Sequence, residues 1–290
     1  MNDLLLAFPG NMDFTKMLSA QTGIDIGELE MHRFPDGESY VRVDSSVKDK
    51  KVVLVCTLNM PDEKLLPLYF LSENLKEMGA LSVSLVAPYL SYMRQDKAFH
   101  PGEAVTSGYF AAFVSSFVDR LITVEPHLHR RSSLSEIYSC PAETIHADEL
   151  ISDWIRNHVK DPLLIGPDKE SEQWVSAVAK DAGAPWIVLE KERKGDSDVV
   201  VSVPHTEKYR FYTPVLVDDI ISTAHTMIET LKHLEKAGMR PAVCLGVHAV
   251  FAGDAYGNLM KAGAGNVVSC NTILHASNGI DISPLISALL

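Results

Sequence analysis

The sequence has no dense run of lysine or arginine and no long uncharged hydrophobic stretch. Its 290 residues include 26 basic and 38 acidic side chains, for a formal net charge of −12. An acidic chain without a basic run is a poor partner for nucleic acid or an anionic membrane. No apolar stretch approaches the ~18 residues that a membrane-spanning helix needs. Local groups of basic residues are therefore more informative about function, because the chain as a whole is acidic.

Cysteine is also scarce, with four widely spaced residues. None of them forms a CxxC pair, so the sequence indicates neither a zinc site nor a disulfide framework. Cys56 and Cys244 lie in apolar stretches, where we expect them to be small buried hydrophobic residues. The N-terminus lacks a basic segment, and its apolar stretch is too short for a secretory signal. We therefore expect a cytoplasmic protein.

Short apolar segments typical of strands alternate with helical patterns through the chain. The 46% hydrophobic and 22% charged composition is that of a globular protein, and 290 residues suit two packed domains. The alternation predicts an α/β protein whose mainly parallel sheets are covered by helices. We expect strands at 52–57, 82–87, 120–125, 163–166, 186–190, 199–203, 214–218 and 243–249, and helices at 64–78, 103–117, 148–159, 171–182 and 225–237.

Residues 52–87 and 214–249 repeat one order of elements: a strand, a helix, a glycine turn and a second strand. The turn reads Met-Gly-Ala in the first copy and Ala-Gly-Met in the second. This weak symmetry predicts two similar domains, residues 1–143 and 144–290. The last residues, 282–290, are candidates to return and pack on the first domain.

The most informative stretch is residues 215–226, where an apolar strand runs into Asp218 and Asp219. Ligands bind at the carboxyl ends of strands in open parallel sheets. The turn at 222–226 offers hydroxyl groups and backbone N–H groups at a helix N-terminus, which suit a phosphate. This arrangement predicts a site for a phosphorylated sugar whose hydroxyls bind the acids. An ordinary strand–turn–helix with a hydroxyl N-cap is the alternative interpretation.

This stretch resembles the phosphoribosyl-diphosphate-binding motif of the phosphoribosyltransferase fold: an apolar run, two acids and a loop that ends in threonine. Three more segments narrow the choice, namely FPDGE at 34–38, RQDK at 94–97 and PGE at 101–103. Taken singly, the first is typical of a turn and the second of a solvated loop. In this order the four motifs resemble ribose-phosphate diphosphokinase, and the resemblance runs from about Phe34 to the last strands.

The resemblance implies two phosphoribosyltransferase-like domains, of which the first takes ATP and the second takes ribose 5-phosphate. It implies that ATP donates its diphosphate to the anomeric oxygen of ribose 5-phosphate, which leaves AMP. Mg²⁺ is the implied cofactor, and a homodimer or larger homo-oligomer is the implied assembly, in which the FPDGE loop reaches a neighbouring subunit's adenine. Two alternatives stay open: a nucleobase phosphoribosyltransferase, which lacks the first three motifs, and a catalytically silent regulatory relative.

Position by position, the resemblance also assigns roles to residues of this chain. On the ATP side it implies contacts by Phe34, Asp36, Glu38, Arg94, Gln95 and Asp96. The implied catalytic residues are Lys191 and Arg193, on a charged loop at 190–198, and His127; His127 and Asp168 are the implied metal ligands. Ribose 5-phosphate would bind at Asp218, Asp219, Ser222, Thr223, Ala224, His225 and Thr226.

Some of these positions have simpler interpretations or depart from the family's pattern. Asp168 could be only a helix-start acid, and the loop at 190–198 only a solvated hairpin. Glu125-Pro126 stands where the family has Asp-Leu before the histidine. His127 and His129 could form a metal pair or a surface pair. His225 replaces a small residue, and we expect its side chain to point outward at the start of the following helix.

Overall fold

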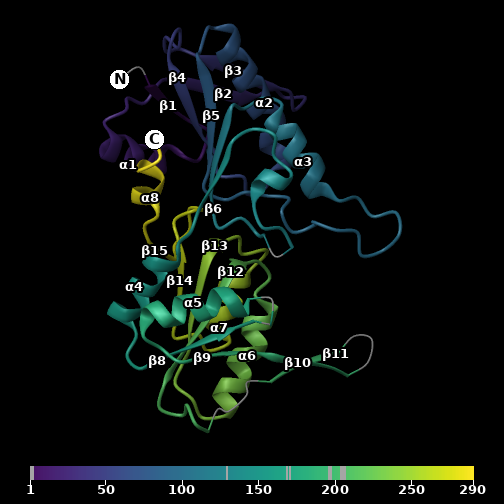
Figure 1. Cartoon of the computed structure of the whole chain (residues 1–290), viewed down its shortest axis with the longest axis vertical. Helices are drawn as coiled ribbons and strands as arrows, with labels where there is room; N and C mark the ends of the chain where they lie inside the picture. Colours follow the sequence, from purple (N-terminus) through teal and green to yellow (C-terminus); the bar gives the residue numbers. More distant parts are fainter. Residues whose placement is uncertain (1–2, 129, 168, 170, 195–197, 203–206) are drawn as a thin grey trace. The chain divides into compact units, whose positions relative to one another are not determined.

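The computed structural model describes residues 3–128, 130–167, 169, 171–194, 198–202 and 207–290. The chain divides into two compact units, Met1–Ile145 with Ser283–Leu290, and His146–Ile282 (Figure 1). Among the described residues, no helix combines the length and the apolar character needed to span a membrane.

The first unit is built on a parallel five-stranded sheet in the order β1-β4-β5-β6-β7. Helices α1 and α8 lie on one side of this sheet, and α2 and α3 lie on the other (Figure 1). The C-terminal α8 packs on α1, where Gln21 Nε2 donates a hydrogen bond to Ser283 Oγ (2.8 Å). The elements are β1 (Asp3–Ala7), α1 (Met12–Thr22), β4 (Lys51–Val55), α2 (Asp62–Glu77), β5 (Ser82–Ala87), α3 (Thr106–Ser115), β6 (Arg120–Val124), β7 (Ala142–Ile145) and α8 (Ser283–Ser287).

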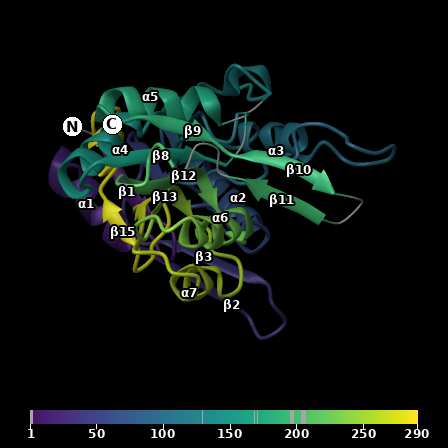
Figure 2. The same ribbon diagram turned by 90° about the horizontal axis from the view of Figure 1, so that it is seen from below.

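The second unit has a parallel six-stranded sheet in the order β15-β14-β13-β12-β8-β9. Helices α4 and α5 cover one face and α6 and α7 the other, as Figure 2 shows. The elements are α4 (Asp148–His158), β8 (Pro162–Gly166), α5 (Glu172–Ala182), β9 (Trp186–Val188), β12 (Thr213–Ile221), α6 (His225–Lys236), β13 (Val243–Ala249), α7 (Ala255–Lys261), β14 (Asn266–Cys270) and β15 (Asn278–Ile280).

The predicted α/β architecture with two sheets of parallel strands is confirmed. The repeat is present as β4-α2-β5 and β12-α6-β13, because each apolar strand must be covered by the helix that follows it. Cys56 and Cys244 are buried as predicted, and burial raises the pKa of each thiol to about 12.

Several predicted strand limits differ from the structure by a few residues, and two predictions that bear on the candidate site were wrong. Strand β12 does not end at Asp218, because Ile220 and Ile221 continue its parallel ladder against His248 and Ala249 of β13. Within the charged segment predicted as a loop at 190–198, residues Glu190–Lys194 form strand β10, which pairs antiparallel with β11 (Asp198–Ser202). The β-branched run in β11 supplies a partner strand, and pairing overrides the polar composition. A second antiparallel ribbon, β2 (Leu29–Arg33) with β3 (Ser39–Val43), belongs to the first unit.

Candidate functional site

Strand β12 holds the two adjacent acids near its carboxyl end. Neighbouring residues of a strand point to opposite faces, so Asp218 and Asp219 diverge. Asp218 Oδ1 accepts a hydrogen bond from the Asp219 N–H (3.0 Å), and Asp219 Oδ1 accepts one from the Ile220 N–H (2.9 Å). Both side chains are half-buried. These local bonds fix each carboxylate close to the backbone at the strand end.

The loop after β12 leads directly into the N-terminus of α6. Ala224 adopts a left-handed conformation (φ 57°), and no described side chain caps the helix. The first backbone bond of the helix runs from the Ile228 N–H to the Ala224 carbonyl (2.9 Å). The N–H groups of the preceding first turn and the positive end of the helix dipole therefore suit an anion.

His225 is the first residue of α6, as predicted, and its side chain is exposed. The positive φ falls one residue earlier, on buried Ala224. Alanine tolerates this conformation less well than glycine, at a cost of roughly 1 kcal/mol. His225 therefore has an ordinary helical backbone, and its imidazole does not need to crowd a ligand.

The neighbouring strand β13 and the segment after it support this loop. The Phe251 N–H donates to the Ile221 carbonyl (2.9 Å), and the Ala252 N–H donates to the Ser222 carbonyl (3.1 Å). In β13, a Cβ atom on Gly246 would lie 2.5 Å from Ile221 Cγ1. The glycine thus leaves room for the buried Ile221 side chain, which anchors the start of the loop.

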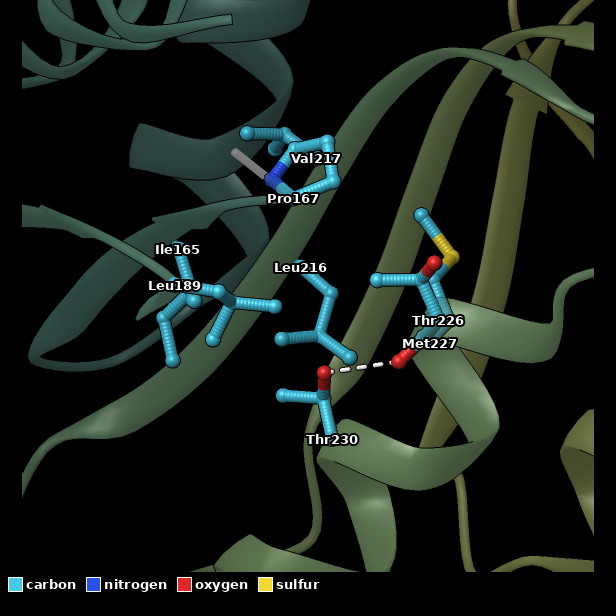
Figure 3. Close-up of a pocket in the computed structure, with 8 residues that line it drawn as sticks. All are labelled: Ile165, Pro167, Leu189, Leu216, Val217, Thr226, Met227 and Thr230. Carbon is cyan, nitrogen blue, oxygen red and sulfur yellow. Dashed lines mark hydrogen bonds between the residues drawn. The ribbon is translucent and has the colours of Figure 1, made fainter. Parts of the chain in front are cut away.

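A small apolar pocket lies beside the start of α6 and encloses about 180 Å³, part of it open to solvent (Figure 3). Inside it, the Thr230 hydroxyl donates to the Thr226 carbonyl (2.7 Å). An apolar lining of this kind does not suit a phosphate, so we assign the pocket to the packing behind the loop. It is lined by Ile165, Pro167, Leu189, Leu216, Val217, Thr226, Met227 and Thr230.

The first unit has a different arrangement at the corresponding place, between β4 and α2. The Lys64 ammonium donates to the Thr57 carbonyl (2.7 Å) and to Asn59 Oδ1 (2.6 Å). Burial lowers the pKa of Lys64. In the first unit, the Lys64 amine therefore binds the loop that corresponds in position to residues 222–226 of the second unit. The first unit also lacks the acidic pair.

In the RQDK segment of the first unit, Arg94 and Lys97 are exposed, whereas Gln95 and Asp96 bind neighbouring elements. Gln95 Oε1 accepts a hydrogen bond from the Thr106 hydroxyl (3.3 Å). Asp96 Oδ1 lies 3.0 Å from Arg130 Nη1, and only 2% of the Asp96 side chain is exposed. The Asp96 carboxylate thus binds another side chain of the protein, and this favours a supporting role over the direct ligand contact that the resemblance implies.

Two arginines that the motifs did not point to hold this segment in place. Arg130 pairs with Asp96, and Arg131 Nη2 donates to the Asp96 carbonyl and the Ser107 hydroxyl (3.4 Å each). The Arg130 guanidinium also lies 5.5 Å from the centre of the Phe99 ring. Two consecutive arginines directly after the histidine motif, in an acidic chain, were the sequence signal that could have revealed them.

His127 follows strand β6 after a sharp change of direction. Glu125 has a φ of 36°, and its N–H donates to the Ile145 carbonyl of β7 (2.9 Å). Pro126 is buried and His127 is half-buried. The departure from the family's Asp-Leu thus coincides with a strained turn, which costs of order 1–3 kcal/mol. His129 and Asp168 lie outside the described residues.

The FPDGE segment forms the tip of the β2–β3 ribbon. The Phe34 N–H donates to the Glu38 carbonyl (2.8 Å), and the Gly37 N–H donates to the Phe34 carbonyl (2.9 Å). Gly37 has a φ of 95°, a conformation that favours glycine. Asp36 Oδ1 accepts a bond from the Glu38 N–H (3.2 Å), and 45% of Phe34 is exposed. The tip therefore exposes an aromatic ring and two carboxylates to solvent.

Lys191 and Arg193 lie on β10 of the second ribbon, in register with Val201 and Val199 of β11. The basic residues are therefore carried by an extended arm and not by an irregular loop.

Comparison with known proteins assigns this architecture to a family. Residues 4–117 match the model of the N-terminal domain of ribose phosphate pyrophosphokinase, and residues 133–283 match that of the phosphoribosyl transferase domain. The chain is 33% identical to ribose-phosphate pyrophosphokinase 2 of Archaeoglobus fulgidus, with 98% of each chain covered. The chain belongs to the ribose-phosphate pyrophosphokinase family.

Other comparisons agree with this assignment. The ribose-phosphate pyrophosphokinase of Saccharolobus solfataricus is 30% identical, with 88% of each chain covered. The crystal structure of phosphoribosylpyrophosphate synthetase from Mycobacterium smegmatis superposes with a TM-score of 0.86 at 21% identity, covering 100% of this chain and 97% of that one. At this identity the structural likeness concerns the fold, and it confirms the predicted architecture.

Proposed function

We propose that the chain transfers the diphosphate of ATP to the anomeric oxygen of ribose 5-phosphate, giving 5-phosphoribosyl 1-diphosphate and AMP. The observation that carries this proposal is the pair Asp218 and Asp219 on β12, followed by the uncapped N-terminus of α6, in a member of this family. The match of residues 4–117 argues against a nucleobase phosphoribosyltransferase, because it is specific to pyrophosphokinases.

On the sugar side, the 5-phosphate would bind the backbone of 222–226 and the hydroxyls of Ser222, Thr223 and Thr226. Charge and geometry support this, because the helix dipole and the first-turn N–H groups favour an anion there. The carboxylates of Asp218 and Asp219 would accept hydrogen bonds from the ribose hydroxyls.

On the ATP side, Arg94 and Gln95 would bind the nucleotide directly, and Asp96 would hold their segment against Arg130. Phe34, Asp36 and Glu38 would contact the adenine bound to a neighbouring subunit. The exposed ribbon tip supports this arrangement, which requires a homodimer or larger homo-oligomer.

In the proposed reaction the anomeric oxygen attacks the β-phosphorus of ATP. The new O–P bond forms as the bridge between the α- and β-phosphates breaks, AMP leaves with the bridging oxygen, and the sugar hydroxyl releases its proton to water. Charge develops on the bridging and equatorial oxygens, where Lys191, Arg193 and His127 would stabilise it. No strong general base is required where positioning and electrostatics dominate.

Mg²⁺ is the proposed cofactor, and the donor set fits it. Carboxylate and phosphate oxygens are the ligands that Mg²⁺ prefers, and the half-buried carboxylates of β12 lie where the sugar phosphate is proposed to bind. Asp168 would be a ligand on the sugar side, and His127 would lie beside the ion bound to ATP. When bound, the ion would neutralise phosphate charge and orient the diphosphate.

The test is product analysis with purified protein, ATP and ribose 5-phosphate. We expect AMP and phosphoribosyl diphosphate in equal amounts, and only when Mg²⁺ is present. Reactions without ribose 5-phosphate, or with excess chelator, should release no AMP. ADP as the product, or no nucleotide product at all, would contradict the proposal; the second result would favour a silent regulatory relative.

A further inference from the structure

The β2–β3 ribbon carries three aromatic rings that pack on one another. His32 and Tyr40 face each other across the antiparallel ladder, and their rings stack with centroids 4.5 Å apart and planes inclined by 18°. The Phe34 ring stands edge-on to both, 5.2 Å from His32 at 79° and 6.1 Å from Tyr40 at 86°. The three rings thus pack together as one cluster at the ribbon tip, which we call the aromatic triad.

The aromatic triad lies on the outer face of the ribbon and not in the core. Side chains alternate along a strand, and Met31 and Val41, on the other face, pack against the hydrophobic core of the first unit. His32 and Phe34 are exposed. Since the inner face already anchors the ribbon, the core does not require rings on the outer face.

The cluster restrains the one ring that the proposed function places on the nucleotide. A hairpin-tip phenylalanine that is 45% exposed would otherwise turn freely about its side-chain bonds. Edge-to-face packing against two stacked rings is a favoured aromatic arrangement. It holds Phe34 by its edge contacts and orients the ring before a ligand binds.

We propose that His32, stacked on Tyr40, is a positioning residue that orients Phe34 for the adenine of ATP. This inference rests on the proposed function, because it requires Phe34 to meet the base. His32 acts through Phe34 and need not touch the nucleotide. Its contribution is to reduce the ordering that binding would otherwise demand of Phe34, and immobilising one such side chain corresponds to roughly three- to tenfold in affinity.

The experiment compares three variants of the full chain. His32→Ala removes the stacking partner, and His32→Phe keeps a flat ring at the same position. Glu30→Gln is the matched control: it lies on the same ribbon, its carboxylate pairs with Arg42 (2.7 Å), and the change leaves all three rings of the triad in place. Each variant is assayed for kcat and for KM of both substrates, for equilibrium binding of ATP by calorimetry, and for assembly size by light scattering.

We expect His32→Ala to raise the KM and the dissociation constant of ATP roughly three- to tenfold, with kcat and the KM of ribose 5-phosphate unchanged. His32→Phe should stay within about twofold of the unmodified chain, and Glu30→Gln should have no effect. Unchanged ATP binding in His32→Ala would overturn the inference. A loss of ATP affinity in His32→Phe as large as that in His32→Ala would also overturn the inference. A change in assembly size would overturn it as well, because it would place the triad in a subunit contact.

The binding measurement separates this inference from the proposed reaction. If the unmodified chain binds ATP but forms no AMP, the proposed function fails. A loss of ATP affinity in His32→Ala would then still support the role of His32.

Discussion

Asp96 and Arg130 form an ion pair that joins two segments of the first unit 34 residues apart in the sequence, with 3.0 Å between Oδ1 and Nη1. Asp96 follows Arg94 and Gln95, and Arg130 lies three positions after His127. The pair therefore holds the RQDK segment to the segment that follows β6. The pair thereby keeps Arg94 and Gln95, which are proposed to bind ATP, in position relative to His127.

The first prediction is that Asp96→Asn destabilises the chain by weakening the contact between these two segments. Breaking a fully buried pair costs about 3–5 kcal/mol. One third of the Arg130 side chain is exposed, so water can partly replace the lost partner, and we expect a smaller loss of roughly 1–2 kcal/mol. The measurement is urea unfolding together with the KM of ATP, which should rise because Arg94 and Gln95 lose their support.

Asp44→Asn is the matched control, because its pair with Arg42 (2.8 Å) is largely exposed and should contribute about 0–1 kcal/mol. A rise in the KM of ATP in Asp96→Asn with no change in stability would show that Asp96 contacts ATP directly.

The second prediction concerns the close packing of Gly246 against Ile221, directly before the loop at 222–226 that is proposed to bind the sugar phosphate. In Gly246→Ala the new Cβ would lie 2.5 Å from Ile221 Cγ1 and 2.7 Å from Cδ1. Overpacking of this kind destabilises by typically 1–3 kcal/mol. Because Ile221 precedes Ser222, we also expect a higher KM for ribose 5-phosphate.

Two further variants test this explanation. Ile221→Ala in the Gly246→Ala background removes the clashing atoms, so the additional penalty of Gly246→Ala should shrink. Gly108→Ala, in α3 with nothing within 4 Å of a new Cβ, should stabilise the chain by up to about 1 kcal/mol. An equally harmless Gly246→Ala would disprove the close-packing argument.

The third prediction is that His225→Gly changes the KM of ribose 5-phosphate by less than about tenfold, or ~1.4 kcal/mol. The reason is that His225 starts α6 with an exposed side chain, whereas the special conformation belongs to Ala224. Ala224→Val is the contrasting variant: a β-branched residue at a φ of 57° should both destabilise the chain and weaken sugar binding. A much tighter sugar complex in His225→Gly would instead reveal that the histidine obstructs the loop.

The fourth prediction is that Arg193→Ala lowers kcat by roughly 10²–10³, the usual effect of removing one transition-state donor. Strand β10 pairs only with β11 among the described strands and belongs to neither parallel sheet. We therefore expect the unfolding midpoint to stay nearly unchanged. Glu192→Gln, the neighbour on the same strand, serves as a control with kcat near that of the unmodified chain. If only the KM of ATP moved in Arg193→Ala, the ribbon would be a binding element.

Much of this architecture could be predicted from local patterns. Strands β5 and β13 occupy the residues expected for them, 82–87 and 243–249, because a continuous apolar run bounded by turns indicates a buried parallel strand. The four motifs identified the family because they follow one another in a characteristic order along the chain. The place of His225 at the start of α6 could also be predicted, since it precedes an amphipathic helical pattern.

Pairing between distant segments could not be predicted in the same way. Composition favoured a loop at 190–198, and only antiparallel pairing with β11 makes residues Glu190–Lys194 a strand. The ion pair of Asp96 with Arg130 and the stacking of His32 on Tyr40 depend on segment contact and strand register. Hydrophobic periodicity indicates which residues face a core, but it does not indicate which residue lies opposite across a sheet or in a contacting loop. The sequence alone therefore determined the family, the α/β class and the candidate residues of the site. The tertiary structure decided which side chains hold them in position, because that depends on contacts between residues far apart in the chain.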